Sequence, residues 1–191
     1  TGTLAPNEAS EVAANASGAV LITLVERGTM VQRGDVLARL DARTAALSAN
    51  EASASVGSAQ TQLELARVEC ERVEKLKAAG AITGAEYDRQ RGACESAQWA
   101  AKAAEARLAT ARKGLGDSIV RAPFAGMIAD RYVSAGEYVQ PSTRVVRLVA
   151  VDPLRLELVV PESSVSEIRQ GLQVDFKVAT YPDQSFSGSV R

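Results

Sequence analysis

The sequence predicts an α+β protein, an elongated chain of several modules: a β unit split into two halves, an antiparallel α-helical coiled-coil hairpin between them, and a partial β-barrel. Three observations predict this class. A short, glycine-punctuated β pattern occurs twice in the 191 residues. Between its two copies the hydrophobic period changes from two to seven, and after residue 152 the strand period returns.

The β repeat is the first of these elements. Residues 18–22 (GAVLI) match residues 126–130 (GMIAD) in character, and Gly28 and Gly136 follow at the same spacing. Glycine permits the positive φ of tight turns, so each copy predicts small β-hairpins. Because neither copy can bury its apolar face alone, we expect the two to pair across a pseudo-twofold axis. The alignment continues with Val36, Leu37 and Leu40 against Val145, Val146 and Leu148.

The segment between the copies, roughly residues 42–116, is rich in Ala, Glu, Arg, Lys and Gln and contains no proline. Its apolar residues follow a and d heptad positions, which predicts a narrow coiled-coil seam, and the mostly polar remaining positions predict solvated outer faces. Two arms of about 35 residues give a rod on the order of 50 Å long. The seam rows are Ala49, Val56, Leu63 and Cys70 with Ala52, Ala59, Ala66 and Val73, and Tyr87, Cys94, Ala101, Leu108 and Leu115 with Ala97, Ala104 and Ala111.

A helix stop and a helix start separate the two arms. Gly80 can take the left-handed C′ position, and Thr83 with Glu86 three residues later has the spacing of a capping box. We therefore expect the turn near Ala81 and Ile82.

The last module begins at an Asp-Pro pair, residues 152–153. Alternating apolar residues over 154–160 and 174–178 predict half-buried strands of a small barrel. Between them, Ser164 and Glu167 have the spacing of a capping box, so we expect a short helix there.

Composition excludes several classes of function. Lys plus Arg number 22 against 23 Asp plus Glu, so there is no basic excess for a nucleic-acid partner. The chain has no His and only two Cys and two Met, which removes the usual enzymatic base and leaves too few soft ligands for a zinc or copper site. We expect no enzyme, and no catalytic, cofactor-binding or metal-binding residues. The longest apolar runs are also too short to cross a bilayer.

The order of modules resembles the periplasmic adaptor (membrane fusion) proteins of bacterial tripartite efflux pumps, the RND type in particular. Residues 28–37 (GTMVQRGDVL) and 120–126 (VRAPFAG) look like the two half-motifs of that family's lipoyl-like domain, and residues 2–6 (GTLAP) look like its leading strand. The resemblance implies five segments: the start of a membrane-proximal domain (1–9), the first half of a lipoyl-like β-sandwich (10–41), the helical hairpin (42–116), the second lipoyl-like half (117–151) and a partial β-barrel domain (152–191).

True lipoyl and biotinyl carrier domains share this β repeat and carry a modified lysine at the turn between their halves. Here residues 40–43 (LDAR) end the first half without a lysine, and covalent attachment needs the amine nucleophile. These residues argue against a carrier domain.

Three residues around the expected tip match a docking motif of the resembled family. Arg72, Leu76 and Thr83 have the spacing of the Arg, Leu and Ser with which adaptors dock onto the outer-membrane channel, with Thr in place of Ser. An exposed Arg can bind carbonyls or carboxylates, a Leu can enter an apolar groove, and a hydroxyl can bond to backbone. The alternative is that Thr83 is only an N-cap, Leu76 ends the seam and Arg72 is solvated.

The two cysteines occupy seam positions in opposite arms, symmetrically about residue 82, so we expect them to face each other near the tip. Cys70 and Cys94 could form a disulfide in an oxidising periplasm, or remain reduced thiols that pack as small apolar residues. A bridge requires a Cα spacing of roughly 4.4–6.8 Å, whereas antiparallel coils usually layer an a residue against a d residue. Both states remain open from the sequence.

The resemblance implies a periplasmic adaptor without cofactor. Its partners would be an inner-membrane transporter and an outer-membrane channel protein, and it would form a homo-oligomer, a hexameric ring, in the full assembly. It would be anchored to the inner membrane through a segment outside these residues. The alternatives are a structural coiled-coil scaffold whose tip has no partner, and an adaptor of an ABC-type or type I secretion system. The sequence names neither the exported small molecule nor the energy source.

Overall fold

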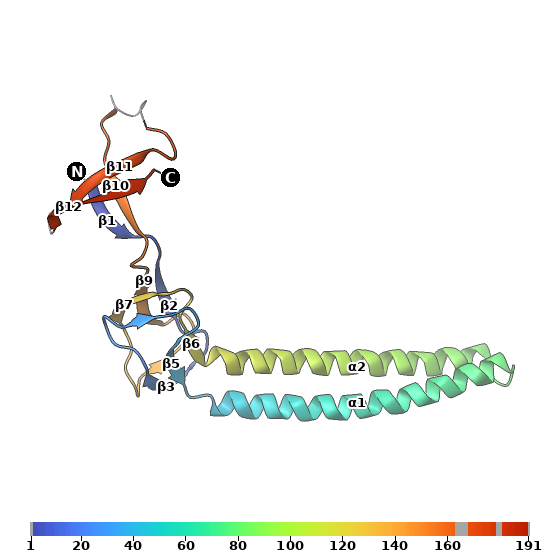
Figure 1. The fold of residues 1–191 in the computed structure, drawn as a ribbon. Helices are drawn as coiled ribbons and strands as arrows, with labels where there is room; N and C mark the ends of the chain where they lie inside the picture. Colours follow the sequence, from blue (N-terminus) through green and yellow to red (C-terminus); the bar gives the residue numbers. More distant parts are fainter. Residues whose placement is uncertain (1, 163–167, 179–180, 191) are drawn as a thin grey trace. The chain divides into compact units, whose positions relative to one another are not determined.

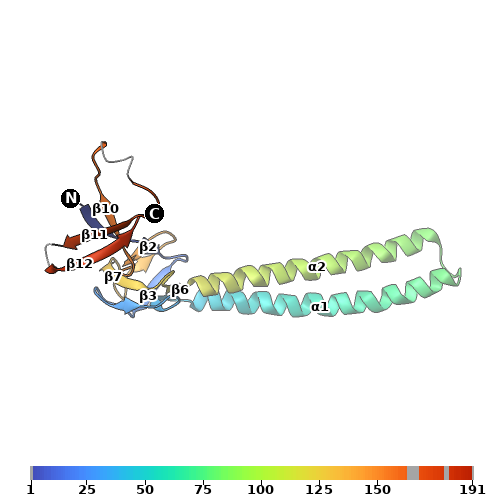
Figure 2. The ribbon, with the colours of Figure 1, turned by 45° about the horizontal axis from the view of Figure 1, so that its top comes forward.

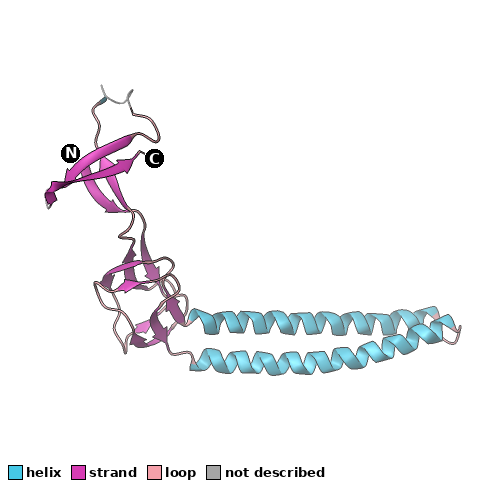
Figure 3. Ribbon diagram, in the orientation of Figure 1, coloured by secondary structure: helices cyan, strands magenta, loops and turns pink. Residues whose placement is uncertain are grey.

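The computed structural model describes residues 2–162, 168–178 and 181–190. The chain divides into two compact units, Asn7–Asp152 and Thr1–Pro6 together with Pro153–Arg191. The predicted α+β class is confirmed, because two long helices occupy one continuous stretch of chain and the strands form antiparallel sheets (Figures 1 and 3).

The β-sandwich lies in the first unit. Its strands are β2 (Ala9–Ala13), β3 (Gly18–Thr23), β4 (Met30–Val31), β5 (Val36–Leu40), β6 (Ile119–Arg121), β7 (Gly126–Arg131), β8 (Tyr138–Val139) and β9 (Arg144–Val149). They form two sheets with the orders β6-β5-β3-β8 and β2-β9-β7-β4. The copies of the repeat therefore exchange their short strands, since β4 pairs with β7 and β8 pairs with β3.

Backbone hydrogen bonds show the pseudo-twofold relation that the repeat predicts. The Gly28 N–H donates to the carbonyl of Ile128, and the Gly136 N–H donates to the carbonyl of Val20, each over 2.8 Å. Both glycines have positive φ, 86° and 93°. Each copy thus forms the same turn and closes it on the other copy.

The core of the sandwich also follows the repeat, with one correction to the alignment. Leu40 pairs with β3 and Leu148 pairs with β7 at equivalent positions. Counting back three residues makes Leu37 the equivalent of Val145, and both are fully buried. The sequence alignment had set Val145 against Val36, one residue away, because neighbouring valines hide the register. The largest fully buried side chains are Leu37, Ile128, Leu148, Val20, Val139, Val145 and Val146.

The helical hairpin consists of α1 (Arg43–Ala78) and α2 (Gly84–Asp117), which run antiparallel to each other (Figure 2). The hairpin is inserted between β5 and β6, which are antiparallel neighbours in one sheet. Both arms are therefore attached at the same end of this strand pair. The seam lies where the heptads predict. The buried residues of the arms are Ala49, Val56 and Val73 in α1 and Ala101, Ala104 and Leu108 in α2.

The end of α1 has the predicted glycine cap. Gly80 has a φ of 67°, and its N–H donates to the carbonyl of Lys77 over 3.0 Å. The Ala81 N–H donates to the carbonyl of Leu76 over 2.9 Å. This pair of bonds is a Schellman motif, which satisfies carbonyls that a helix end would otherwise leave without partners.

The second unit contains β1 (Gly2–Pro6), β10 (Leu154–Leu158), β11 (Gln173–Val178) and β12 (Tyr181–Ser189). β1 pairs with β10, so the structure joins two segments that the sequence had placed in separate modules. β11 pairs with β12, where Phe176 and Phe186 stack with ring centroids 5.9 Å apart. The helix expected from Ser164 and Glu167 begins outside the described residues.

Candidate functional site

The tip of the hairpin carries the predicted docking residues, and two of them share a face. Arg72 and Leu76 lie in the last two turns of α1, four residues apart, so their side chains are neighbours on the helix surface. The Arg72 guanidinium is 2.9 Å from a carboxylate oxygen of Glu69, with the Arg72 side chain 63% exposed. Such an exposed ion pair is worth about 0–1 kcal/mol, so the guanidinium can exchange it for a partner's carboxylate at little cost.

Thr83 lies on the other side of the turn, at the N-cap of α2. Its hydroxyl oxygen accepts a hydrogen bond from the Glu86 backbone N–H over 3.2 Å, which is the N-cap contact that the sequence predicted. The hydroxyl proton remains to be donated. Arg72 and Leu76 thus form one surface, whereas Thr83 belongs to the start of the second arm.

One charged and one aromatic side chain join the arms next to the turn. The Lys77 ammonium lies over the ring of Tyr87, 3.4 Å from its centroid. This cation–π contact reaches from the last turn of α1 to the first turn of α2. Heptad reasoning placed Tyr87 in the seam but did not identify Lys77. The signal was in the sequence, because both residues lie five positions from residue 82.

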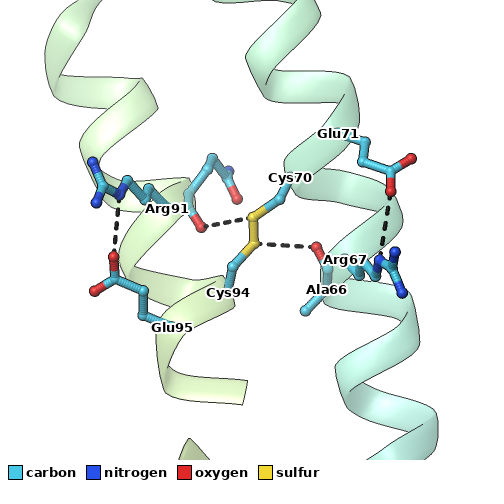
Figure 4. Close-up of a disulfide and its surroundings, with 8 residues drawn as sticks. Ala66, Arg67, Cys70, Glu71, Arg91, Cys94 and Glu95 are labelled. Atoms are coloured by element: carbon cyan, nitrogen blue, oxygen red, sulfur yellow. Dashed lines mark hydrogen bonds and ion pairs between the residues drawn. A yellow bond between two sulfur atoms is a disulfide. The ribbon is translucent and has the colours of Figure 1, made fainter. Parts of the chain in front are cut away.

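A disulfide crosses the hairpin farther from the turn (Figure 4). Cys70 and Cys94 are bridged in the structure, and their Cα atoms are 6.5 Å apart, within the usual range for a disulfide. Each arm adds its own ion pair on the outside of the bridge: Arg67 lies 3.6 Å from Glu71 on α1, and Arg91 lies 3.1 Å from Glu95 on α2. The bridge holds the register of the two arms close to the tip.

An open groove of about 570 Å³ lies along one face of the hairpin beside the disulfide. Glu64 of α1 and Lys102 of α2 both line it. Both acidic and basic side chains line its walls, and the acidic ones are in excess. Among the residues that the structure describes, no three His, Cys, Asp or Glu side chains gather as metal ligands.

The base of the hairpin carries a perturbed carboxylate. Hydrogen bonds from the Arg43 side chain, and then from the Arg43 backbone N–H, lower the pKa of Asp41 from 3.8 to about 2. Asp41 and Arg43 lie where the chain passes from β5 into α1, and their side chains form an ion pair there.

The outer faces of the hairpin were predicted to be mostly polar, and four large apolar residues are exceptions. Leu47, Leu65, Val68 and Trp99 lie outside the seam and are largely exposed. Their signal was present in the sequence as large apolar residues at heptad positions other than a and d. Heptad counting overlooked them because it searches only for the seam.

Within the described ranges, no helix has an apolar stretch long enough to span a bilayer.

Comparison with known proteins places this architecture in a family. A model of the CzcB-like barrel-sandwich hybrid domain matches residues 8–150, which contain the sandwich and the hairpin. The nodulation protein NolF of Rhizobium meliloti (strain 1021) is 30% identical over 191 residues, 99% of this chain and 52% of NolF. The multidrug resistance protein MdtA of Yersinia pseudotuberculosis serotype O:3 (strain YPIII) is 26% identical over 171 residues, 88% of this chain and 38% of MdtA. The chain thus spans about half or less of these relatives.

Solved structures share the fold. MacA from Actinobacillus actinomycetemcomitans superposes with a TM-score of 0.74 at 22% identity, covering 98% of this chain and 63% of MacA. The membrane fusion protein Spr0693 from Streptococcus pneumoniae R6 superposes with a TM-score of 0.73 at 18% identity, covering 98% of this chain and 79% of Spr0693. The family match, the relatives and the fold agree with the resemblance seen in the sequence: the chain belongs to the CzcB-like barrel-sandwich hybrid family of periplasmic adaptor, or membrane fusion, proteins.

Proposed function

We propose that this chain forms the hairpin and sandwich of the adaptor in an RND-type tripartite efflux pump. It bridges an inner-membrane transporter and an outer-membrane channel for the export of small molecules. The observation that carries the proposal is the tip of the hairpin, where exposed Arg72 and Leu76 share one face of α1.

The tip suits docking because contacts between the two arms already order its backbone in the absence of a partner. The Cys70–Cys94 bridge and the contact of Lys77 with Tyr87 tie the arms together on both sides of the docking face. Binding through such a pre-ordered surface loses less conformational entropy than binding through a flexible loop. Leu76 is 38% exposed and offers an apolar anchor, and the Arg72 guanidinium beside it offers a planar fork of donors.

The assembly follows from the geometry of a conduit. A single two-helix rod encloses no channel, so several copies must stand side by side. A repeated contact between unlike surfaces closes into a ring when its rotation divides a full turn. We propose that the ring contains six copies, as the resemblance to the adaptor family implies. The disulfide suits an oxidising periplasm at the inner membrane, and the printed name of MdtA, a multidrug resistance protein, supports small molecules as the cargo.

Efflux of a fluorescent drug from cells that express Arg72→Asp or Leu76→Asp tests the docking face. Both variants are expected to lose efflux while protein abundance and helix content stay at the wild-type level. The matched controls are Arg67→Asp, which removes an equally exposed ion-paired Arg outside the tip, and Leu47→Asp, which changes an exposed Leu near the sandwich. The controls are expected to keep efflux.

A binding assay separates the adaptor from a scaffold. The wild-type protein is mixed with the outer-membrane channel, and capture is compared with that of Leu76→Asp. We expect capture of the wild type and at least tenfold less of the variant. Equal efflux from both, with no capture of either protein, would show that the tip has no partner, and the scaffold interpretation would then replace the adaptor.

A further inference from the structure

Three large apolar side chains lie exposed on the hairpin within two turns of the disulfide, on the side toward the sandwich. Leu65 and Val68 on α1 and Trp99 on α2 are 69%, 51% and 67% exposed. Single exposed apolar residues are common on protein surfaces and need no explanation. These three differ from scattered surface residues in three respects. They lie on opposite outer edges of the hairpin, Leu65 and Trp99 lie at the same distance from the disulfide along the helix axis, and the charges beside them are complementary.

The directions of these side chains follow from the helix period. Val68 falls midway between the seam residues Ala66 and Cys70, which puts it on the side of α1 that faces away from α2. By the same count, Trp99 lies opposite the α2 seam, midway between residues 97 and 101. The hairpin therefore has an apolar patch, Leu65 with Val68, on one outer edge and an apolar knob, Trp99, on the opposite edge.

The patch and the knob lie at the same height. Leu65 comes five residues before Cys70, and Trp99 comes five residues after Cys94. Because the disulfide joins Cys70 and Cys94 in antiparallel arms, both positions are about 7–8 Å from the bridge, toward the sandwich. A second hairpin standing parallel beside the first would bring its patch to the level of the knob without any axial shift.

The neighbouring charges are complementary and lie on the same face. Lys102 flanks the knob, with its ammonium 4.6 Å from the centroid of the Trp99 ring. Glu64 flanks the patch, because it lies four residues before Val68 on the surface of α1. Both side chains line the groove on one broad face of the hairpin. Two parallel hairpins that turn this face the same way would place Lys102 of one beside Glu64 of the other.

We propose that α2 of one copy packs against α1 of a second copy, with Trp99 on the Leu65–Val68 patch and Lys102 opposite Glu64 of the second copy. The two surfaces differ, so the contact is heterologous and continues from copy to copy. This inference rests on the ring of the proposed function and names the surfaces by which its hairpins meet. The patch is far smaller than the roughly 1,000 Å² of a stable interface, so the contact aligns hairpins that are already assembled.

Cross-linking in cells that express the protein tests the contact. Trp99→Cys and Leu65→Cys variants are expressed separately and together, and then treated with a short bis-maleimide; the bridged native cysteines do not react. Co-expression is expected to give at least tenfold more cross-linked dimer than either variant alone, because in a heterologous contact position 99 meets position 65 and never another 99. Trp99→Cys with Leu47→Cys is the matched control, since position 47 lies 18 residues, about 27 Å, from position 65.

A charge exchange tests the orientation. Lys102→Glu in the Trp99→Cys copy is expected to lower the cross-linked fraction several-fold, and Glu64→Lys in the Leu65→Cys copy is expected to restore it. A folding defect in one copy would not be repaired by a change in the other. Dimers from Trp99→Cys alone, or no dimers from the mixed copies in cells that still export drug, would overturn the contact and leave the proposed function standing. Arg72→Asp cells that lose efflux but keep the cross-link would show that docking and lateral packing are separate.

Discussion

The sandwich and the hairpin belong to one compact unit but are stabilised in different ways. The sandwich encloses large side chains that are fully buried, such as Leu37 and Ile128, between strands from both ends of the unit. In the hairpin, only three of the 36 residues of α1 are buried, and these are two valines and one alanine. At roughly 1.5–3 kcal/mol for each large buried side chain, long-range burial stabilises the sandwich. Local helix formation, the caps and the disulfide stabilise the hairpin, whose surface remains available for partners.

The sharpest test of this difference removes one leucine from each region. Leu37→Ala in the sandwich is expected to cost about 4 kcal/mol of unfolding free energy, because the site is enclosed and cannot collapse. Leu63→Ala in the seam is expected to cost about 1–2 kcal/mol, because Leu63 borders the open groove and water can fill the space. Hydrogen exchange of amides in β5 and α1 measures the two regions separately. Equal losses would contradict the comparison.

Removing the disulfide is expected to weaken the hairpin alone. Replacing both cysteines by Ala frees a loop whose ends are 24 residues apart, worth about 3 kcal/mol in the chain-entropy model. Amides of the tip turns are expected to exchange faster, while those of β3 and β7 keep their wild-type rates. Thiol titration of the denatured, unreduced wild-type protein from the periplasm should find no free thiol. Two free thiols per chain would refute the bridge.

Within the sandwich, the two copies of the repeat differ at one turn. Gly34 has a φ of 93°, and its repeat equivalent Ser142 has a φ of 74°. A left-handed backbone costs a residue with a Cβ about 1 kcal/mol or more relative to glycine. Ser142→Gly is therefore expected to raise the unfolding free energy by up to about 1 kcal/mol, and Gly34→Ala to lower it by about 1 kcal/mol. Thermal unfolding of both variants checks this, and a lower melting temperature for Ser142→Gly would contradict it.

The smallest expected effect is at the junction of the two regions. Because the pKa of Asp41 falls from 3.8 to about 2 on folding, its ion pair with Arg43 stabilises the folded state above about pH 4. That contribution is lost as the pH falls through about 2. An NMR titration of the Asp41 carboxyl should show the low pKa, and Arg43→Gln should move it back toward 3.8. An unchanged value in Arg43→Gln would exclude Arg43 as the cause.

Features that depend on neighbouring residues could be predicted from the sequence. The C-cap at Gly80, the N-cap at Thr83 and the seam through Val56 each follow from a few residues along one helix. The strand exchange could not be predicted, since Met30–Val31 in β4 is too short to favour one sheet over the other. At the tip, spacing identified Arg72 and Leu76, but the exposure that makes them accessible depends on how both arms pack.

The exchanged strands also set an order of folding. β3 precedes the hairpin and its partner β8 follows it, so their sheet cannot close until the ribosome has synthesised residue 139. The other sheet contains β9 and cannot close until residue 149. The contacts between the two arms are local at the tip, so the hairpin can form from the tip toward the sandwich, and local contacts form faster than distant strand pairings. Once α1 and α2 zip together, β5 and β6 become neighbours, and the long loop whose closure would oppose pairing is already closed. The helical hairpin, which separates the two halves of the sandwich along the chain, is therefore expected to bring those halves together during synthesis.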